Sequence, residues 1–252
     1  MSAFRGNREE IRGDIIPAMF CHNCGSHVTP DDKFCPSCGT ALGLGSPGLA
    51  GAPGAVWIPP SHMVEVRAGH WLSEGWRIVR NDMGVYVLLT LTFLALGSMA
   101  AGLAQGSLIA GLHIFTMRKI LGRNAEFADI FRGFNFFVPT LIASLVIALF
   151  VGVATLFFLI PGLVVAAMYK FTYLFIVDKR MDFWQAMRAS HAVVRRDYVG
   201  FTLFLILLLL VDLLGVLFFV VGIFVALPVT FAAITVAYRE IVGFDQRTID
   251  AL

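Results

Sequence analysis

Four cysteines, the only ones in the 252-residue chain, form two Cys-x-x-Cys pairs within the segment "CHNCGSHVTPDDKFCPSCGT", residues 21–40. Each pair makes a tight turn that directs two thiolates toward one point, and the glycine after each pair leaves room for backbone amides to approach the sulfurs. Two such turns supply the closed tetrahedral shell of a structural zinc ion. We therefore predict a zinc site with four ligands, Cys21, Cys24, Cys35 and Cys38.

The same four thiolates fit other chemistries. A rubredoxin-type iron site uses the same two turns, so the spacing leaves zinc and iron both open. Two disulfides would require an oxidising compartment, and a thioredoxin-like redox pair would require a surrounding βαβ fold, which the sequence lacks. His22 and His27 lie nearby, but four cysteines complete the site, so we interpret both histidines as surface residues. Such a closed site has no open position for catalysis.

The cysteine segment is too short to have a hydrophobic core, so its bound metal must supply its folding free energy. The stretches "SHV", "TPDD" and "KF" are typical of a short hairpin between the two turns. The segment resembles the zinc-ribbon modules found at the N-termini of many bacterial membrane proteins, and the resemblance covers residues 20–42. It implies that the four cysteines are metal ligands, and it implies no enzymatic activity.

The rest of the chain has the composition of a membrane protein. The whole sequence is 58% hydrophobic and 14% charged, with a mean hydropathy of +0.80, whereas about a quarter of the residues of a soluble domain are charged. The apolar residues form three blocks, at 84–117, 134–177 and 199–237. Each block is about long enough for two helices of roughly 20 residues. Each has helix-weakening residues near its middle, which are Gly102 to Gly106, Pro161-Gly162 and Gly222.

These blocks predict an all-α multi-pass membrane domain of about six transmembrane helices in three hairpins. Between residues 61 and 252, the lysines and arginines lie before, between or near the ends of the blocks, and none lies in a mid-block turn. The positive-inside rule then places both termini and both long loops in the cytoplasm. We predict an integral protein of the inner membrane, which agrees with a reduced, metal-binding N-terminus. The net charge of +2 gives no reason to expect a nucleic acid partner.

An amphipathic segment precedes each block. The segments are "HWLSEGWRIVRN" at 70–81, "EFADIFRGF" at 126–134 and "DFWQAMRASHAVVRRDY" at 182–198. Each has apolar and aromatic residues on one helical face and charged or polar residues on the other, which is typical of helices that lie in the membrane interface. The stretch that begins at Phe115 also resembles the one that begins at Phe171, so we predict a repeated unit of one interfacial helix and one hairpin.

Asp212, Lys170 and His113 lie within the apolar blocks and are candidates for an intramembrane site. An acidic residue deep in a membrane helix is costly and suggests proton or cation handling. The structural alternative is a protonated aspartate, or one that is hydrogen-bonded to a neighbouring helix. Lys170 can extend its ammonium to the cytoplasmic surface, and we expect Asp212 to lie too deep to contact Lys170 directly.

Small residues at four-residue spacing also occur in the apolar blocks. The pairs are Gly102 and Gly106, Ser107 and Gly111, and Gly162 and Ala166. This spacing allows close packing of membrane helices. We interpret it as packing within one chain, and the sequence leaves the oligomeric state open.

The membrane part resembles a broad set of bacterial six-helix integral membrane proteins of unassigned function. The resemblance lies in "AGHWLSEGWRIVRND", "PGLVVAAMYKFTYLFIVDKRMDFWQAMRAS" and "YREIVG", and covers residues 68–243. It implies an inner-membrane location and a role in envelope homeostasis, and it implies no catalytic residues. The expected organisation is a disordered or mis-assigned start at 1–18, a zinc ribbon at 19–42, a flexible Gly/Pro/Ala linker at 43–66, the membrane domain at 67–243 and a cytoplasmic tail at 244–252.

The sequence favours a non-enzymatic scaffold or adaptor. Its helices would bind the lipid bilayer, and its zinc ribbon would bind a cytosolic or membrane protein partner. The alternative is a small transporter or channel that uses Asp212. We do not expect an enzyme, because the sequence has no nucleophile–base pair, phosphate-binding loop or second metal cluster.

Overall fold

The computed structural model describes residues 65–99, 103–217, 222–245 and 248–249, together with two short strands near the start of the chain. The chain divides into two compact units, Met1–Leu49 and Ala50–Leu252. In the first unit, β1 (Met19–Phe20) and β2 (His27–Val28) pair in antiparallel orientation. The predicted extension at 1–18 lies outside the described residues, as does nearly all of the predicted linker at 43–66.

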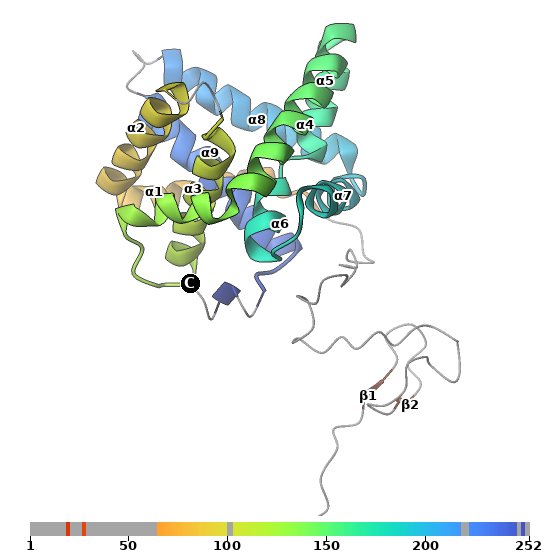
Figure 1. Cartoon of the computed structure of the whole chain (residues 1–252), viewed down its shortest axis with the longest axis horizontal. Helices are drawn as coiled ribbons and strands as arrows, with labels where there is room; N and C mark the ends of the chain where they lie inside the picture. The colour runs from red at the N-terminus through yellow and green to blue at the C-terminus, as the bar shows by residue number, and fades with distance from the viewer. Residues whose placement is uncertain are drawn as a thin grey trace, which may run out of the picture. The chain divides into compact units, whose positions relative to one another are not determined.

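The described part of the second unit is helical (Figure 1). Its elements are α1 (Ala68–Asn81), α2 (Met83–Met99), α3 (Gln105–Ile120), the 3-10 helix η1 (Phe127–Phe136), α4 (Phe137–Phe157), α5 (Leu159–Met168), α6 (Thr172–Asp178), α7 (Phe183–Val194), α8 (Tyr198–Leu217) and α9 (Ile223–Ile241). The three predicted apolar blocks correspond to α2 with α3, α4 with α5 and α6, and α8 with α9. The mainly helical fold is therefore confirmed.

Four helical segments are long and apolar enough to cross a membrane. They are Phe127–Phe157, Leu159–Asp178, Tyr198–Leu217 and Ile223–Ile241. A fifth would consist of α1 and α2, which are bent by 100° relative to each other, if they are counted as one broken span. The described helices thus have the length and composition of a membrane protein with four or five spans. The six predicted crossings are not confirmed, because α2 has 17 residues and α3 has 16, fewer than the roughly 20 of a typical crossing.

The centre of the helical unit consists of α3 and α9. Eleven residues are buried in each of them, whereas only two of the 21 residues of α4 are buried. α9 contacts α1, α2, α3 and α8. Alanines at positions 232, 233 and 237 are fully buried in α9, and such small side chains let helices approach closely. These central helices are therefore held by protein contacts more than by lipid.

The first amphipathic segment forms α1, and its apolar face packs on α9. A Cβ atom at Gly75 would lie 2.8 Å from the backbone nitrogen of Ala233, so the two helix backbones are in contact. Trp71 is buried and donates its indole N–H to Glu240 over 2.8 Å, while Trp76 is 41% exposed. Only part of the predicted membrane-facing surface of this segment is therefore free to contact lipid.

The α4–α5 hairpin is the most exposed part of the described helices. It extends beyond the other helices in Figure 1, and Leu156, Phe158 and Ile160 are 85%, 74% and 73% exposed. The break between the helices lies at Phe158, which has an extended backbone, and Pro161 lies in the first turn of α5, where its missing N–H costs little. An apolar hairpin this exposed requires an apolar surrounding such as lipid chains.

The second amphipathic segment forms η1, and a row of four phenylalanine rings follows η1 into the first residue of α4. The ring centroids of Phe127 and Phe131 are 6.1 Å apart, and those of Phe134 and Phe137 are 6.3 Å apart. Phe131, Phe134 and Phe137 are partly exposed, whereas Ile130 is fully buried. Aromatic side chains are enriched at membrane interfaces, but η1 also forms the start of the candidate span Phe127–Phe157, so its interfacial position stays a prediction.

Candidate functional site

The two paired strands flank the first cysteine turn. Met19 pairs with Val28 and Phe20 pairs with His27, so the ends of the segment that contains Cys21 and Cys24 are held side by side. The four cysteines lie outside the described residues, as does the predicted strand "KF" at 33–34. As a donor set, four cysteine thiolates fit a closed structural zinc site, and they would hold the ion without an open coordination position.

A break in the second membrane segment positions Lys170. α5 ends at Met168 and α6 begins at Thr172, so Lys170 lies in the connection. Ser190 of α7 donates its hydroxyl to the carbonyl oxygen of Met168 over 2.7 Å and accepts from the backbone N–H of Phe171 over 3.2 Å. Backbone groups freed inside a membrane require such partners, and this long-range contact stabilises the break.

His113 of α3 is buried against α9. Its Nδ1 atom lies 2.8 Å from the hydroxyl of Thr235, and that hydroxyl also donates to the carbonyl oxygen of Phe231 over 2.9 Å. A threonine hydroxyl has one proton. With that proton on the bond to Phe231, Nδ1 of His113 would be the donor to Thr235.

Asp212 of α8 also contacts a threonine of α9. The distance between its Oδ1 atom and the hydroxyl of Thr230 is 3.3 Å, while the same hydroxyl donates to the carbonyl oxygen of Leu227 over 2.8 Å. The bond to Leu227 is the shorter one and uses the hydroxyl proton. A protonated Asp212 could then donate a hydrogen bond to Thr230. This arrangement corresponds to the structural role given above as the alternative to proton or cation handling.

The fold brings the three predicted intramembrane residues into one neighbourhood. Lys170 lies within electrostatic range of both Asp212 and His113. Among the described residues, no direct ion pair joins Lys170 to Asp212. Sequence reasoning missed the threonines of α9 and Ser190, although a hydroxyl residue within an apolar helix is itself a sign of cross-helix hydrogen bonding.

A second polar cluster joins the ends of α6 and α9. The side chain of Asp178 is buried. It accepts a hydrogen bond from the hydroxyl of Tyr238 over 2.9 Å and forms an ion pair with Lys179 over 3.1 Å. It also accepts the backbone N–H of Asp245 over 2.9 Å, and its own carbonyl oxygen accepts from Thr248 over 2.7 Å. Asp178 thus fixes the segment after α9 to the end of α6, which we interpret as a structural role.

In the parts of the chain that the structure describes, no group of three or more histidine, cysteine, aspartate or glutamate side chains could hold a metal ion. The metal prediction therefore concerns the cysteine segment, whose ligands lie outside those parts. It has independent support, because residues 20–42 match the zinc-ribbon domain family. This match covers the two cysteine pairs and indicates zinc binding.

No curated protein and no solved structure matches the chain. The resemblance of residues 68–243 to bacterial six-helix membrane proteins gains no support from these comparisons and stays a prediction. Together, the zinc-ribbon match and the apolar helices indicate a membrane protein with an N-terminal zinc module.

Proposed function

We propose that this chain is a non-enzymatic scaffold or adaptor of the bacterial inner membrane, with a zinc ribbon that binds a protein partner in the cytoplasm. The observation that carries the proposal is the zinc-ribbon match at residues 20–42, within a unit that is separate from the helical one. A zinc site completed by four cysteines stabilises the fold of its module and leaves no coordination position for a substrate. A small, metal-folded module joined to a membrane anchor is suited to docking, and a role in envelope homeostasis follows from the resemblance.

The adaptor function is tested by removing the ribbon while the membrane anchor stays intact. We expect chemical cross-linking and mass spectrometry of native membranes to recover a specific protein partner with the wild type. The Cys21→Ser/Cys24→Ser variant should lose that partner, because a ribbon without its metal has no folded surface. His22→Ala/His27→Ala is the matched control and should retain the partner, since four cysteines complete the site. The same partners in the cysteine variant and the wild type would contradict the proposal.

A small transporter or channel is the second candidate function, and one observation favours it. The membrane segment is broken at Lys170, and both Asp212 and His113 lie within electrostatic range of that lysine. Broken helices with intramembrane charges are features of transporter binding sites. However, His113 is hydrogen-bonded to Thr235, and Asp212 to Thr230. Such bonds between helices also occur where the polar side chains have only a structural role.

Replacing Asp212 with asparagine distinguishes the two functions. We expect the Asp212→Asn variant to retain cellular function and to lose less than about 1 kcal/mol of stability, because an asparagine amide can still hydrogen-bond Thr230 and the existing bond is long. Complementation of a deletion strain and thermal unfolding in detergent measure the two quantities. Proton or cation flux in liposomes that is present in the wild type and absent in Asp212→Asn would instead favour the transporter.

A further inference from the structure

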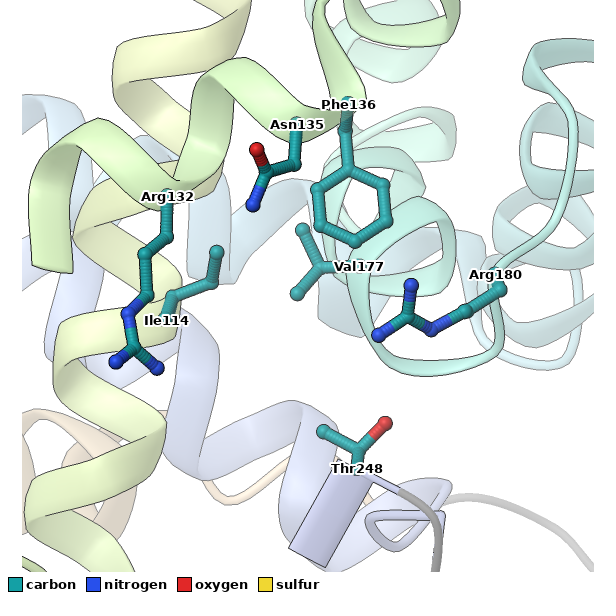
Figure 2. A pocket seen from close by; sticks show the side chains of 7 residues that line it. All are labelled: Ile114, Arg132, Asn135, Phe136, Val177, Arg180 and Thr248. Atoms are coloured by element: carbon teal, nitrogen blue, oxygen red, sulfur yellow. The ribbon is translucent and has the colours of Figure 1, made fainter. Parts of the chain in front are cut away.

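A cavity lined by two arginines has no role in the proposed adaptor function. It has a volume of about 230 Å³ and lies between α3, η1, α6 and the segment at Thr248. Figure 2 shows the side chains of Arg132 and Arg180 on opposite sides of the cavity, with Asn135 between them. The lining includes two positively charged residues and no acidic one. Its electrostatic character is therefore suited to an anion.

Neither arginine of the cavity has its charge fully neutralised by its neighbours. Arg132 contacts Asp129 through Nε over 3.0 Å, but Asp129 is shared with Arg118, whose Nε lies 3.2 Å away. Two guanidinium groups thus surround one carboxylate. Arg180 forms no ion pair with any residue that the structure describes, and its guanidinium carbon lies 5.4 Å from the centre of the Phe136 ring. The group of three arginines and one aspartate has a formal charge of +2.

The backbone of Arg180 is also unusual. Its φ angle is +50°, in the left-handed region that residues other than glycine seldom adopt. Arg180 directly follows Lys179, the C-cap of α6, and a left-handed residue at this position is a common way for a helix to end. The geometry places a charged side chain next to the cavity at the start of the loop between α6 and α7.

An apolar groove adjoins the charged cavity. It has a volume of about 520 Å³ and shares Phe136 and Arg180 with the cavity. Val138 and Ile142 of α4 and Ile176 of α6 line it. Val138 is 63% exposed, so the groove is open to the surroundings of the helices. Asp182, the acidic residue of this lining, caps α7 by accepting the backbone N–H of Gln185 over 2.9 Å.

The positions of the cavity and the groove along the membrane segments match the two parts of a phospholipid. Arg132 lies near the start of the candidate span Phe127–Phe157, before α4, and Arg180 follows Asp178, the last residue of another candidate span. Both guanidinium groups therefore belong to the ends of membrane segments, where lipid headgroups lie. The groove is lined by apolar residues of α4 and α6 that adjoin these ends, and in a bilayer such residues would face acyl chains.

We propose that this chain binds an anionic phospholipid, with the headgroup phosphate between Arg132 and Arg180 and an acyl chain in the groove of Phe136, Val138, Ile142 and Ile176. Arginine binds phosphate oxygens through two parallel N–H groups, and basic pockets between membrane helices recognise anionic headgroups. The proposal goes beyond the adaptor function and requires only that the helices lie in a bilayer.

The test titrates phosphatidylglycerol into the full-length, zinc-loaded protein in detergent micelles and measures bound lipid by native mass spectrometry. Phosphatidylcholine, which has the same chains and no net charge, serves as the comparison. We expect the wild type to prefer phosphatidylglycerol, and Arg180→Gln to lower its affinity roughly tenfold, because one charge-assisted contact is lost. Arg180→Lys should lose less, since it keeps the charge without the paired N–H groups.

Arg188→Gln is the control, because Arg188 is an exposed arginine of α7 that lines neither the cavity nor the groove. It should bind both lipids like the wild type, and thermal unfolding of each variant checks that the fold is intact. Unchanged phosphatidylglycerol binding in Arg180→Gln, an equal loss in Arg188→Gln, or equal affinity for the two lipids would overturn the proposal. So would displacement of the lipid by inorganic phosphate at similar concentration, which would identify an anion pocket without a lipid site.

Discussion

Replacing Cys21 and Cys24 with serine is expected to abolish metal binding completely. The wild type should contain one zinc ion per chain, and the Cys21→Ser/Cys24→Ser variant should contain none, because two thiolates leave half of a tetrahedral shell empty. Structural zinc sites gain roughly 10–16 kcal/mol from the metal at neutral pH, and a module without a core has no other source of folding free energy. Elemental analysis of the purified protein after gel filtration measures the metal content.

The same measurement separates the alternatives that the cysteine spacing leaves open. Iron in the purified protein, with the visible absorption of a ferric tetrathiolate, would identify a rubredoxin-type site. The His22→Ala/His27→Ala variant should retain the full metal content, since we assign no ligand role to either histidine. A cysteine variant that keeps one zinc per chain, or a histidine variant that loses it, would disprove the four-cysteine ligand set.

Metal loss should leave the helical unit unaffected. The chain divides into units at residues 49 and 50, and the contacts that hold the helices, such as those of Trp71 with Glu240 and Asp178 with Tyr238, lie within the second unit. We therefore read any loss of a protein partner in the cysteine variant as loss of the ribbon. This interpretation requires that the wild type and the Cys21→Ser/Cys24→Ser variant insert into the membrane to the same extent.

The helical elements were predictable because their signals are local. Long apolar blocks with charges at their ends predict the outer bounds of α2 with α3, of α4 to α6, and of α8 with α9 to within a few residues. The zinc-ribbon module was predictable for the same reason, since two short cysteine turns define it and residues 20–42 match that domain family. The number of crossings was not predictable in the same way. α2 and α3 are short, and both pack against α9.

Features that depend on contacts distant in sequence could not be predicted. The break at Lys170 has no glycine or proline within "AAMYKFTY", and it is stabilised by Ser190 of α7. The face of α1 was predicted to meet lipid, yet Gly75 allows it to pack against α9. The arginine cavity joins η1 to the loop after α6, and no spacing rule in a single sequence relates Arg132 to Arg180.

Within the helical unit, the largest loss of stability is expected from adding a methyl group where α3 meets η1. A Cβ atom at Gly111 would overlap the carbonyl oxygen of Ile130, and one at Gly133 would overlap that of Ser107. In both cases the obstacle is backbone, which cannot move aside as a side chain can. Overpacking costs about 1–3 kcal/mol or more. We expect Gly111→Ala and Gly133→Ala each to lower the melting temperature in detergent by roughly 5–10 °C.

Gly152→Ala in α4 is the matched control for these substitutions, because a Cβ atom there would meet nothing within 4 Å. It should be neutral or stabilising, since alanine favours the helix over glycine by up to about 1 kcal/mol. The comparison also decides what the small residues of α3 do. If Gly111 served contacts between two chains, Gly111→Ala would change the oligomeric state in size-exclusion chromatography and leave the stability of the monomer near that of Gly152→Ala. A loss of stability without a change of oligomeric state would establish packing within one chain, through the same contact that holds η1 and Arg132 in place.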